Sequence, residues 1–360
     1  MAKNIFQQYV REHLKKIKTY DAVKPAKSIN TNLDIEVIKL NGNENPYGCS
    51  VKAIQAVSSL DSFHIYPDPD QIEIRTALSE YTGVDQTKIV AGSGCDEIID
   101  LLIRLFLEPG DNVLECIPTF GMYSFSTRVS GGSVKSIPRD LNFNVIGEDV
   151  IKQIDNKSKI VFIASPNNPT GNWTSEDEIK KILDTGIIVV VDETYFEFCK
   201  KSLVGLIQQY ENLIILRSLS KWAGLAGLRI GYGIMSENLV KYIMDIKPPY
   251  NVNVAAEAAL LASLKDSVNL LSKVDLILKE RTIFETQLST FGNVKIYPSS
   301  GNFVLCEFPS NQGIRVYKEL EKVGIFVRYF NEPRLTDCIR ISIGTSSNMQ
   351  RLTEALYKIL

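Results

Sequence analysis

The sequence predicts an α/β fold: a mostly parallel central sheet with helices on both faces, plus a smaller α+β domain. Two observations predict it. Short runs of Ile and Val alternate with helical stretches from about residue 86, and the run Ile187–Val191 is apolar throughout, as in strands buried on both faces. The length of 360 residues suits two domains at about 150 residues each. We expect a large domain over residues 45–250 and a small domain over residues 251–360, with residues 1–44 packing on the small domain or on a partner subunit.

The expected elements of the large domain follow in a regular order. Residues 1–20 have the pattern of an amphipathic, basic helix, and a loop rich in Asn, Gly and Pro follows at residues 41–50. Six apolar runs then predict the strands of the central sheet, and residues 96–107 are typical of the helices between them. These runs are Ile89–Ala91, Val113–Cys116, Ile160–Ala164, Ile187–Val191, Leu213–Leu216 and Ile230–Ile234.

The pattern changes at Pro248 and Pro249, because two prolines fit neither a helix interior nor a central strand. A long helical stretch is expected from about residue 255 into the 280s, and another helix near residues 312–322. The strands of the small domain are expected at Val294–Ile296, Phe303–Glu307, Ile325–Arg328 and Ile339–Ile343.

Composition excludes several functions. Lys and Arg number 40 and Asp and Glu 42, so the net charge of -2 gives no broad electrostatic reason to bind nucleic acid or an anionic membrane. No apolar run approaches the about 20 residues of a membrane span, and Met1–Arg11 lacks a signal peptide's apolar core, so we expect a cytoplasmic protein. The six cysteines form no C-x-x-C motif and are expected to be reduced.

Histidine chemistry is also disfavoured. The sequence has two histidines, His13 and His64, and neither has a metal-ligand partner at useful spacing. We therefore expect no metal site, no zinc hydrolase and no histidine-based triad. The chemistry either uses no histidine or depends on an organic cofactor.

Polar and glycine residues gather just after five of the expected strands, which is where ligands bind in an open α/β sheet. Gly92-Ser93-Gly94 ends one strand and opens a helix, so its amides either bind an anion or form an ordinary turn. The other segments are Pro118-Thr119-Phe120, Ser165–Gly171, Asp192–Tyr195 and Ser218–Lys221.

Three charged residues stand out among these segments. Asp192 ends the most hydrophobic strand, where a carboxylate either caps the next helix or pairs with a cation such as a protonated ring nitrogen. Lys221 is either a surface lysine or a sheltered amine that attacks carbonyls. Arg229 lies among small and apolar residues, where an arginine needs an anionic partner.

The order of these motifs resembles that of the fold-type I pyridoxal 5′-phosphate-dependent aminotransferases of class I and II. The chemistry agrees with the resemblance: an aldehyde cofactor needs a lysine, and its ring nitrogen needs a carboxylate. Its phosphate needs amides, hydroxyls and a cation, and its ring needs a flat surface to stack on.

The resemblance implies pyridoxal 5′-phosphate as the cofactor and assigns a role to each matching residue. Lys221 is the Schiff-base lysine, Asp192 pairs with the pyridinium nitrogen, and Tyr195 completes the catalytic set. The further cofactor-binding residues are Asn168 at the phenolic oxygen, Phe120 on the ring, Cys95, Asp96, Ser218 and Arg229 at the phosphate, and Tyr66, which reaches the neighbouring subunit's phosphate. The implied substrate-binding residues are Arg340, Arg328, Tyr20 and Asn43. Tyr66 thereby implies a homodimer.

Within that family, the chain most resembles the histidinol-phosphate aminotransferases. The matching segments are Leu40–Gly48, Tyr66-Pro67-Asp68, Gly121-Met122-Tyr123, Pro248–Val252 and Ser300–Phe303. Two arginines in one pocket, Arg328 and Arg340, suit substrates with a phosphate or two carboxylates. This resemblance implies transamination between L-histidinol phosphate and 2-oxoglutarate, in histidine biosynthesis.

Three alternatives remain open at this point. One is an aromatic amino-acid aminotransferase, and another is a threonine-phosphate decarboxylase. The third is a non-enzymatic regulator, which we disfavour because Lys221 is intact and about 40 residues before Asn41 leave little room for a DNA-binding module.

Overall fold

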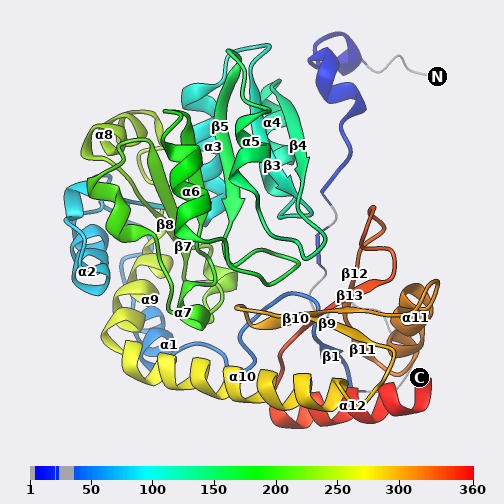
Figure 1. The fold of residues 1–360 in the computed structure, drawn as a ribbon. Coiled ribbons are helices and arrows are strands. Elements are labelled where there is room, and N and C mark those ends of the chain that lie inside the picture. The colour runs from blue at the N-terminus through cyan, green and yellow to red at the C-terminus, as the bar shows by residue number, and fades with distance from the viewer. Residues whose placement is uncertain (1–4, 21, 24–35) are drawn as a thin grey trace.

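The computed structural model describes residues 5–20, 22–23 and 36–360, and Figure 1 shows two sheets side by side. The larger sheet contains β2 (Ile89–Gly92), β3 (Asn112–Ile117), β4 (Ser133–Pro138), β5 (Ser158–Ala164), β6 (Ile188–Asp192), β7 (Leu213–Ser218) and β8 (Gly231–Ile234). Their order is β2-β8-β7-β6-β5-β3-β4. Every neighbouring pair is parallel except the two that include β8, which runs antiparallel to β2 and β7. The predicted α/β class with a mostly parallel sheet is confirmed.

Helices cover both faces of this central sheet (Figure 1). On one face lie α3 (Cys95–Phe106), α4 (Met122–Ser130) and α8 (Glu237–Ile246). On the other lie α5 (Gly147–Ile151) and α6 (Glu176–Leu183). Val190 packs into the first layer and Val191 into the second, as the two-residue period of a strand requires. Burial on both faces explains why the central strands have unbroken apolar sequences.

The second sheet belongs to the C-terminal part of the chain. Its strands are β9 (Lys295–Tyr297), β10 (Phe303–Glu307), β12 (Arg328–Tyr329) and β13 (Cys338–Ser342). They form an antiparallel sheet in the order β12-β13-β10-β9, accompanied by α11 (Gly313–Lys322) and α12 (Ser346–Ile359). A separate parallel pair joins β1 (Ile38–Lys39) to β11 (Ile325–Phe326), which directly precedes β12. This pair attaches the chain just before residue 40 to the C-terminal part of the protein.

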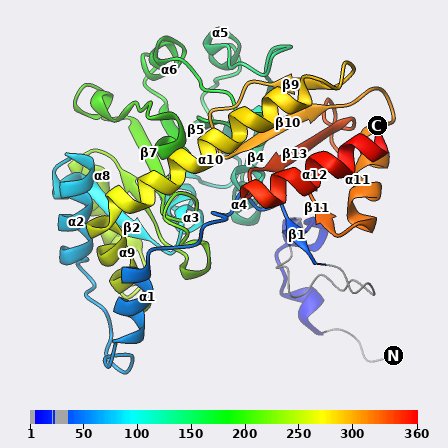
Figure 2. The same cartoon turned by 90° about the horizontal axis from the view of Figure 1, so that it is seen from below.

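A long helix connects the two sheets. α10 (Ser267–Leu288) runs along both of them, from α7 (Phe196–Cys199) to α12, as Figure 2 shows. The preceding helix α9 (Val254–Lys265) packs against α1 (Val51–Ser58) and α2 (Ile72–Thr82), beside the central sheet. The packing partners therefore change along α10 and not at residue 250, and the domain boundary there stays a prediction.

The N-terminal segment differs from the expected helix. Residues 5–20 contain two 3-10 helices, η1 (Ile5–Gln8) and η2 (Glu12–Lys16), and residues 1–4 lie outside the described residues. No apolar side chain here is fully buried: Leu14 and Ile17 are half-buried and the others are exposed, so no buried face stabilises an α-helix. Arg11 and His13 contact the carbonyl oxygen of Val129 in α4, so this part lies on the large domain, whereas β1 joins the small one.

Three further elements depart from the expected pattern. β4 was not anticipated, because an edge strand is half exposed and its sequence is largely polar. The stretch expected from residue 255 is two helices that meet at Asp266, and the run at residues 325–328 divides between β11 and β12. All six cysteines are free. Among the described residues, no helix combines the length and apolar character that crossing a membrane requires.

Candidate active site

The predicted cofactor residues gather at one edge of the central sheet. The carboxyl ends of its parallel strands meet there, and β8 begins at this edge because it runs in the opposite direction. A pocket at this edge is lined by every predicted cofactor residue except Tyr66. These residues are Cys95, Asp96, Phe120, Asn168, Asp192, Tyr195, Ser218, Lys221 and Arg229.

Asp192, the last residue of β6, supplies a buried carboxylate to this pocket, with 7% of its surface exposed. Its Oδ2 accepts a hydrogen bond from Tyr123 Oη at 2.7 Å. Its Oδ1 accepts from the backbone nitrogen and Oγ1 of Thr194, at 3.0 and 2.6 Å. Burial raises the pKa of Asp192, although the hydrogen bonds oppose that shift. None of these donors is a cation, so the carboxylate is oriented while its charge remains available to a cationic ligand.

Lys221 follows β7 and lines the same pocket. Its Nζ donates a hydrogen bond to the carbonyl oxygen of Gly42 at 3.2 Å. Burial, and then the nearby charge of Arg340, lowers the pKa of Lys221 from 10.5 to about 8. The amine therefore becomes neutral, and so nucleophilic, at a much lower pH than an exposed lysine does.

Tyr195 links the pocket to the N-terminal segment and to the small sheet. Asn43 Nδ2 donates a hydrogen bond to Tyr195 Oη at 2.8 Å, and Ser342 Oγ donates to Asn43 Oδ1 at 2.7 Å. Burial raises the pKa of Tyr195 to about 12, with Arg340 and Asn43 acting in the other direction. The phenol therefore keeps its proton at neutral pH and can donate it in a hydrogen bond to an anionic oxygen.

The start of α3 and Arg229 form a corner of the pocket that suits an anion. Gly94 precedes the helix with φ 78° and gives it no side-chain cap. A Cβ on Gly94 would lie 2.5 Å from Arg229 Nη2, so the close approach depends on glycine. Arg229 has the anionic partner expected from the sequence, because its Nη2 donates to Asp96 Oδ2 at 2.8 Å, but its side chain is 46% exposed. The helix amides and the guanidinium together match a phosphate group.

A second pocket adjoins the first and contains all the predicted substrate residues. The two pockets share Phe120, Asn168, Tyr195 and Lys221 among their linings. The substrate residues in the second pocket are Tyr20, Asn43, Arg328 and Arg340.

Arg340 on β13 is 6% exposed. Its Nη1 donates to Asn168 Oδ1 and its Nη2 to the carbonyl oxygen of Asn41, both at 2.5 Å, while its Nε has no partner among the described residues. Burial lowers the pKa of Arg340 to about 10, so it stays charged at neutral pH. Arg328 lies directly opposite it on β12. Like charges across a strand pair repel, and an anion between them relieves that repulsion.

The sequence model of the family described as aminotransferase class I and II matches residues 35–356. The chain belongs to this family of aminotransferases.

Several named proteins are similar to this aminotransferase over nearly its whole length. A histidinol-phosphate aminotransferase from Dehalococcoides mccartyi is 44% identical and covers 97% of both chains. One from Roseiflexus castenholzii is 40% identical and covers 97% of this chain and 98% of its own. The crystal structure of a histidinol-phosphate aminotransferase from Clostridium acetobutylicum gives a TM-score of 0.84 at 28% identity, covering 90% of this chain and 99% of that one.

Tyr66 is the one predicted cofactor residue of the aminotransferase that does not reach its pocket. Its side chain is 76% exposed, and its ring stacks on that of Tyr250 with centroids 4.4 Å apart. Within one chain, Tyr66 is therefore not a cofactor residue, and its predicted reach to a neighbouring subunit stays a prediction.

Sequence reasoning assigned no role to three residues that the fold brings to the site. Tyr123 binds Asp192 and places its ring edge-on to Phe120, with centroids 5.6 Å apart. Thr194 holds the other oxygen of Asp192, and Ser342 holds Asn43. Tyr123 lies three residues after Phe120, close to the start of α4. Residues at that spacing on a helix lie on one side, so the sequence could have indicated that Tyr123 approaches the pocket together with Phe120.

Proposed function

We propose that this aminotransferase uses pyridoxal 5′-phosphate to transfer an amino group from L-histidinol phosphate to 2-oxoglutarate, which yields imidazole acetol phosphate and L-glutamate. The observation that carries the proposal is the meeting of Lys221, whose pKa is about 8, and buried Asp192 in one pocket. The neighbouring pocket with Arg328 and Arg340 suits a substrate with more than one negative charge. The names of the similar proteins support the same substrate.

The residues of the first pocket fit each part of the proposed cofactor. Lys221 Nζ suits an aldehyde, and Asp192 offers an oriented carboxylate to a protonated ring nitrogen. The space that Gly94 leaves beside Arg229, with uncapped amides at the start of α3, suits the phosphate. Phe120 offers a ring face.

Each of these side chains has a distinct task in the proposed reaction. When bound, pyridoxal 5′-phosphate supplies an aldehyde for the amino group and a ring that withdraws electrons. Lys221 would hold the cofactor through its aldehyde, and its free amine would move the proton at the substrate carbon that bears nitrogen. Asp192 would keep a proton on the ring nitrogen, and Tyr195 Oη would donate a hydrogen bond to the phenolic oxygen. Arg340 orients the substrate through its anionic group.

Two alternative substrates would use the same pair of arginines differently. An aromatic amino acid would use Arg340 for its carboxylate and leave Arg328 without a ligand. Threonine phosphate would use both arginines and lose its carboxylate. A panel of histidinol phosphate, phenylalanine and threonine phosphate separates these functions. We expect the highest kcat/KM with histidinol phosphate, and negligible turnover of it would contradict the proposal.

The two arginines are expected to have different effects on specificity. Replacing Arg340 with alanine should lower kcat/KM for glutamate, histidinol phosphate and phenylalanine alike. Each of them carries an anionic group close to the reacting carbon, a carboxylate in the two amino acids and the phosphate in histidinol phosphate. The loss should be about tenfold or more, since a charge-assisted hydrogen bond contributes about 1.5–3 kcal/mol. Arg328→Ala should lower kcat/KM for glutamate and histidinol phosphate, because Arg328 would bind the distal carboxylate of the first or the phosphate of the second, and should spare phenylalanine, which has neither group.

Arg340→Lys is the matched variant for this experiment. Lysine retains the charge but loses the planar fork that bonds Asn168 and the Asn41 carbonyl together, so this variant should also be impaired. Equal losses for all three donors in Arg328→Ala would contradict the division of roles.

We further propose a homodimer in which Tyr66 reaches the partner's cofactor phosphate. Five large apolar side chains close to Tyr66 in the sequence are exposed, each with 58–64% of its surface accessible, and a second copy of the chain would bury them. These residues are Val51, Ile54, Phe63, Ile65 and Ile72.

Mixed inactive variants test this shared site. Tyr66→Ala and Lys221→Ala homodimers are each expected to be impaired, and subunit exchange between them should restore part of the activity. One site of each mixed dimer then contains both wild-type side chains. Absence of recovery, after exchange has been demonstrated by mass spectrometry, would mean that each site is complete within one chain.

A further inference from the structure

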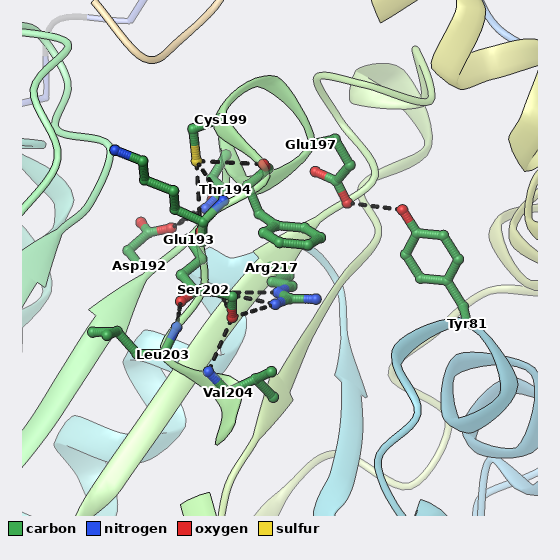
Figure 3. Close-up of polar contacts among 12 residues, drawn as sticks. Tyr81, Asp192, Glu193, Thr194, Glu197, Cys199, Ser202, Leu203, Val204 and Arg217 are labelled. Carbon is green, nitrogen blue, oxygen red and sulfur yellow. Dashed lines mark hydrogen bonds and ion pairs between the residues drawn. The ribbon is translucent and has the colours of Figure 1, made fainter. Parts of the chain in front are cut away.

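A buried pair of charged side chains, Glu193 and Arg217, lies beside Asp192 of the cofactor pocket, and Figure 3 shows its polar contacts. Glu193 follows Asp192, and Arg217 precedes Ser218. Successive side chains of an extended strand point to opposite faces, so this pair points away from the face that lines the pocket. The glutamate side chain is 0% exposed and that of the arginine is 3% exposed.

The pair is bonded on all sides. Arg217 donates to Glu193 Oε2 from Nη2 at 2.9 Å and from Nε at 3.1 Å. Ser202 Oγ donates to the same oxygen at 2.8 Å and accepts from Arg217 Nη2 at 2.6 Å. The backbone nitrogen of Leu203 donates to Glu193 Oε1 at 2.7 Å. The guanidinium also lies over the ring of Phe196, 3.8 Å from its centroid. This geometry leaves little freedom to either side chain.

A second buried carboxylate, that of Glu197, lies close to the pair, so two groups could neutralise the charge of Arg217. Burial raises the pKa of Glu197 to about 8, and Tyr81 Oη donates to it at 3.2 Å. Burial raises the pKa of Glu193 too, but there Arg217 and the hydrogen bonds from Leu203 and Ser202 oppose the shift. Glu193 is the carboxylate that accepts two hydrogen bonds from the guanidinium, so it is the main counter-charge of Arg217.

Stability alone gives no reason for such a pair, because apolar residues of similar volume often stabilise an interior equally well. The backbone around it supplies another reason. The Glu193 nitrogen donates to the Leu216 carbonyl at 2.8 Å, which joins the ends of β6 and β7. The Arg217 carbonyl accepts from Cys95 Sγ at 3.1 Å, at the start of α3. The backbone of the pair therefore contacts the three places that carry pocket residues: the end of β6 with Asp192, the end of β7 with Ser218, and the start of α3 with Cys95.

We propose that Glu193 and Arg217 are positioning residues, whose ion pair holds Asp192, Ser218 and the start of α3 in the arrangement that binds the cofactor. Neither side chain lines the pocket. The proposal rests on the proposed function, since the cofactor's ring nitrogen and phosphate are the groups that need this arrangement.

The test separates positioning from stability. In the double variant Glu193→Leu/Arg217→Met, apolar side chains replace the pair, and the thermal midpoint of the cofactor-free protein should stay close to that of the wild type. Its dissociation constant for pyridoxal 5′-phosphate should nevertheless rise about tenfold or more, as happens when the supporting partners of metal ligands are removed. The pH dependence of the bound cofactor's absorbance should shift as well. Glu193→Gln should show the same two changes.

Val316→Ala is the control, because Val316 is buried in α11 of the small domain, away from the pocket. It should lower the thermal midpoint without changing cofactor affinity. Wild-type affinity and wild-type pH dependence in both pair variants would overturn the proposal, and if the double variant does not fold, Glu193→Gln alone decides. A wild-type protein that does not bind pyridoxal 5′-phosphate would instead contradict the proposed function.

Discussion

The purified protein is expected to be yellow from bound pyridoxal 5′-phosphate. Replacing Lys221 with alanine is expected to remove that colour and to lower kcat by about 10⁴-fold, because one amine both holds the cofactor and moves the proton. Burial and Arg340 lower the pKa of Lys221 to about 8. Capture of added pyridoxal 5′-phosphate by the cofactor-free wild type should therefore accelerate as the pH rises through about 8, as the neutral amine accumulates, and should level off above it.

The measurements are the absorbance spectrum, turnover, and peptide mapping after borohydride reduction. Lys241→Ala serves as the matched control, because Lys241 is an exposed lysine that pairs with Glu237 on α8. The control should retain colour and activity. A Lys221→Ala protein that forms a reducible adduct at another lysine and still turns over would remove Lys221 from its assigned role.

Asp192→Ala is expected to leave the protein folded and to lower kcat by at least about a hundredfold, the size of effect seen when an oriented electrostatic partner is deleted. Without the carboxylate, the ring nitrogen of the cofactor loses its proton and withdraws electrons less strongly. The cofactor should remain bound, because Lys221 and the phosphate corner are unchanged. The effect should therefore appear in kcat with little loss of colour.

Tyr123→Phe is the companion variant, since it removes the 2.7 Å hydrogen bond to Asp192 Oδ2 but leaves the carboxylate and both Thr194 bonds in place. Its loss should be about tenfold or more but smaller than that of Asp192→Ala, because one hydrogen bond to a charged group contributes about 1.5–3 kcal/mol. Full activity in Asp192→Ala would exclude Asp192 from the reaction. A larger loss in Tyr123→Phe than in Asp192→Ala would mean that the tyrosine hydroxyl itself acts on the ligand.

Much of the central sheet could be predicted because its strands are buried on both faces. The runs that became β5, β6 and β7 are apolar for this reason. The direction of β8 could not be predicted, because a short buried strand has the same composition in either orientation. That reversal has a functional effect, since it brings Arg229 to the pocket edge.

The site was predictable where chemistry demands a residue type and less so where contacts depend on tertiary structure. A lysine and a carboxylate after neighbouring strands have few other uses together, which is why Lys221 and Asp192 stood out. Nothing in the sequence couples Glu193 to Arg217, because their contact depends on how β6 and β7 align. The exposed position of Tyr66 is likewise a result of how one chain folds, whereas its predicted role at a cofactor phosphate requires two chains.

The position of β13 between β12 and β10 has a consequence for the protein's synthesis. Both neighbours of β13 precede it in the sequence, so the small sheet cannot close until residues 338–342 have left the ribosome. By then the chain already contains Lys221, Asp192 and Arg229 on a central sheet whose last strand, β8, ends at Ile234. A nascent chain can therefore assemble the cofactor pocket before Arg340 has been synthesised, and the ability to bind substrate is among the last properties that it acquires.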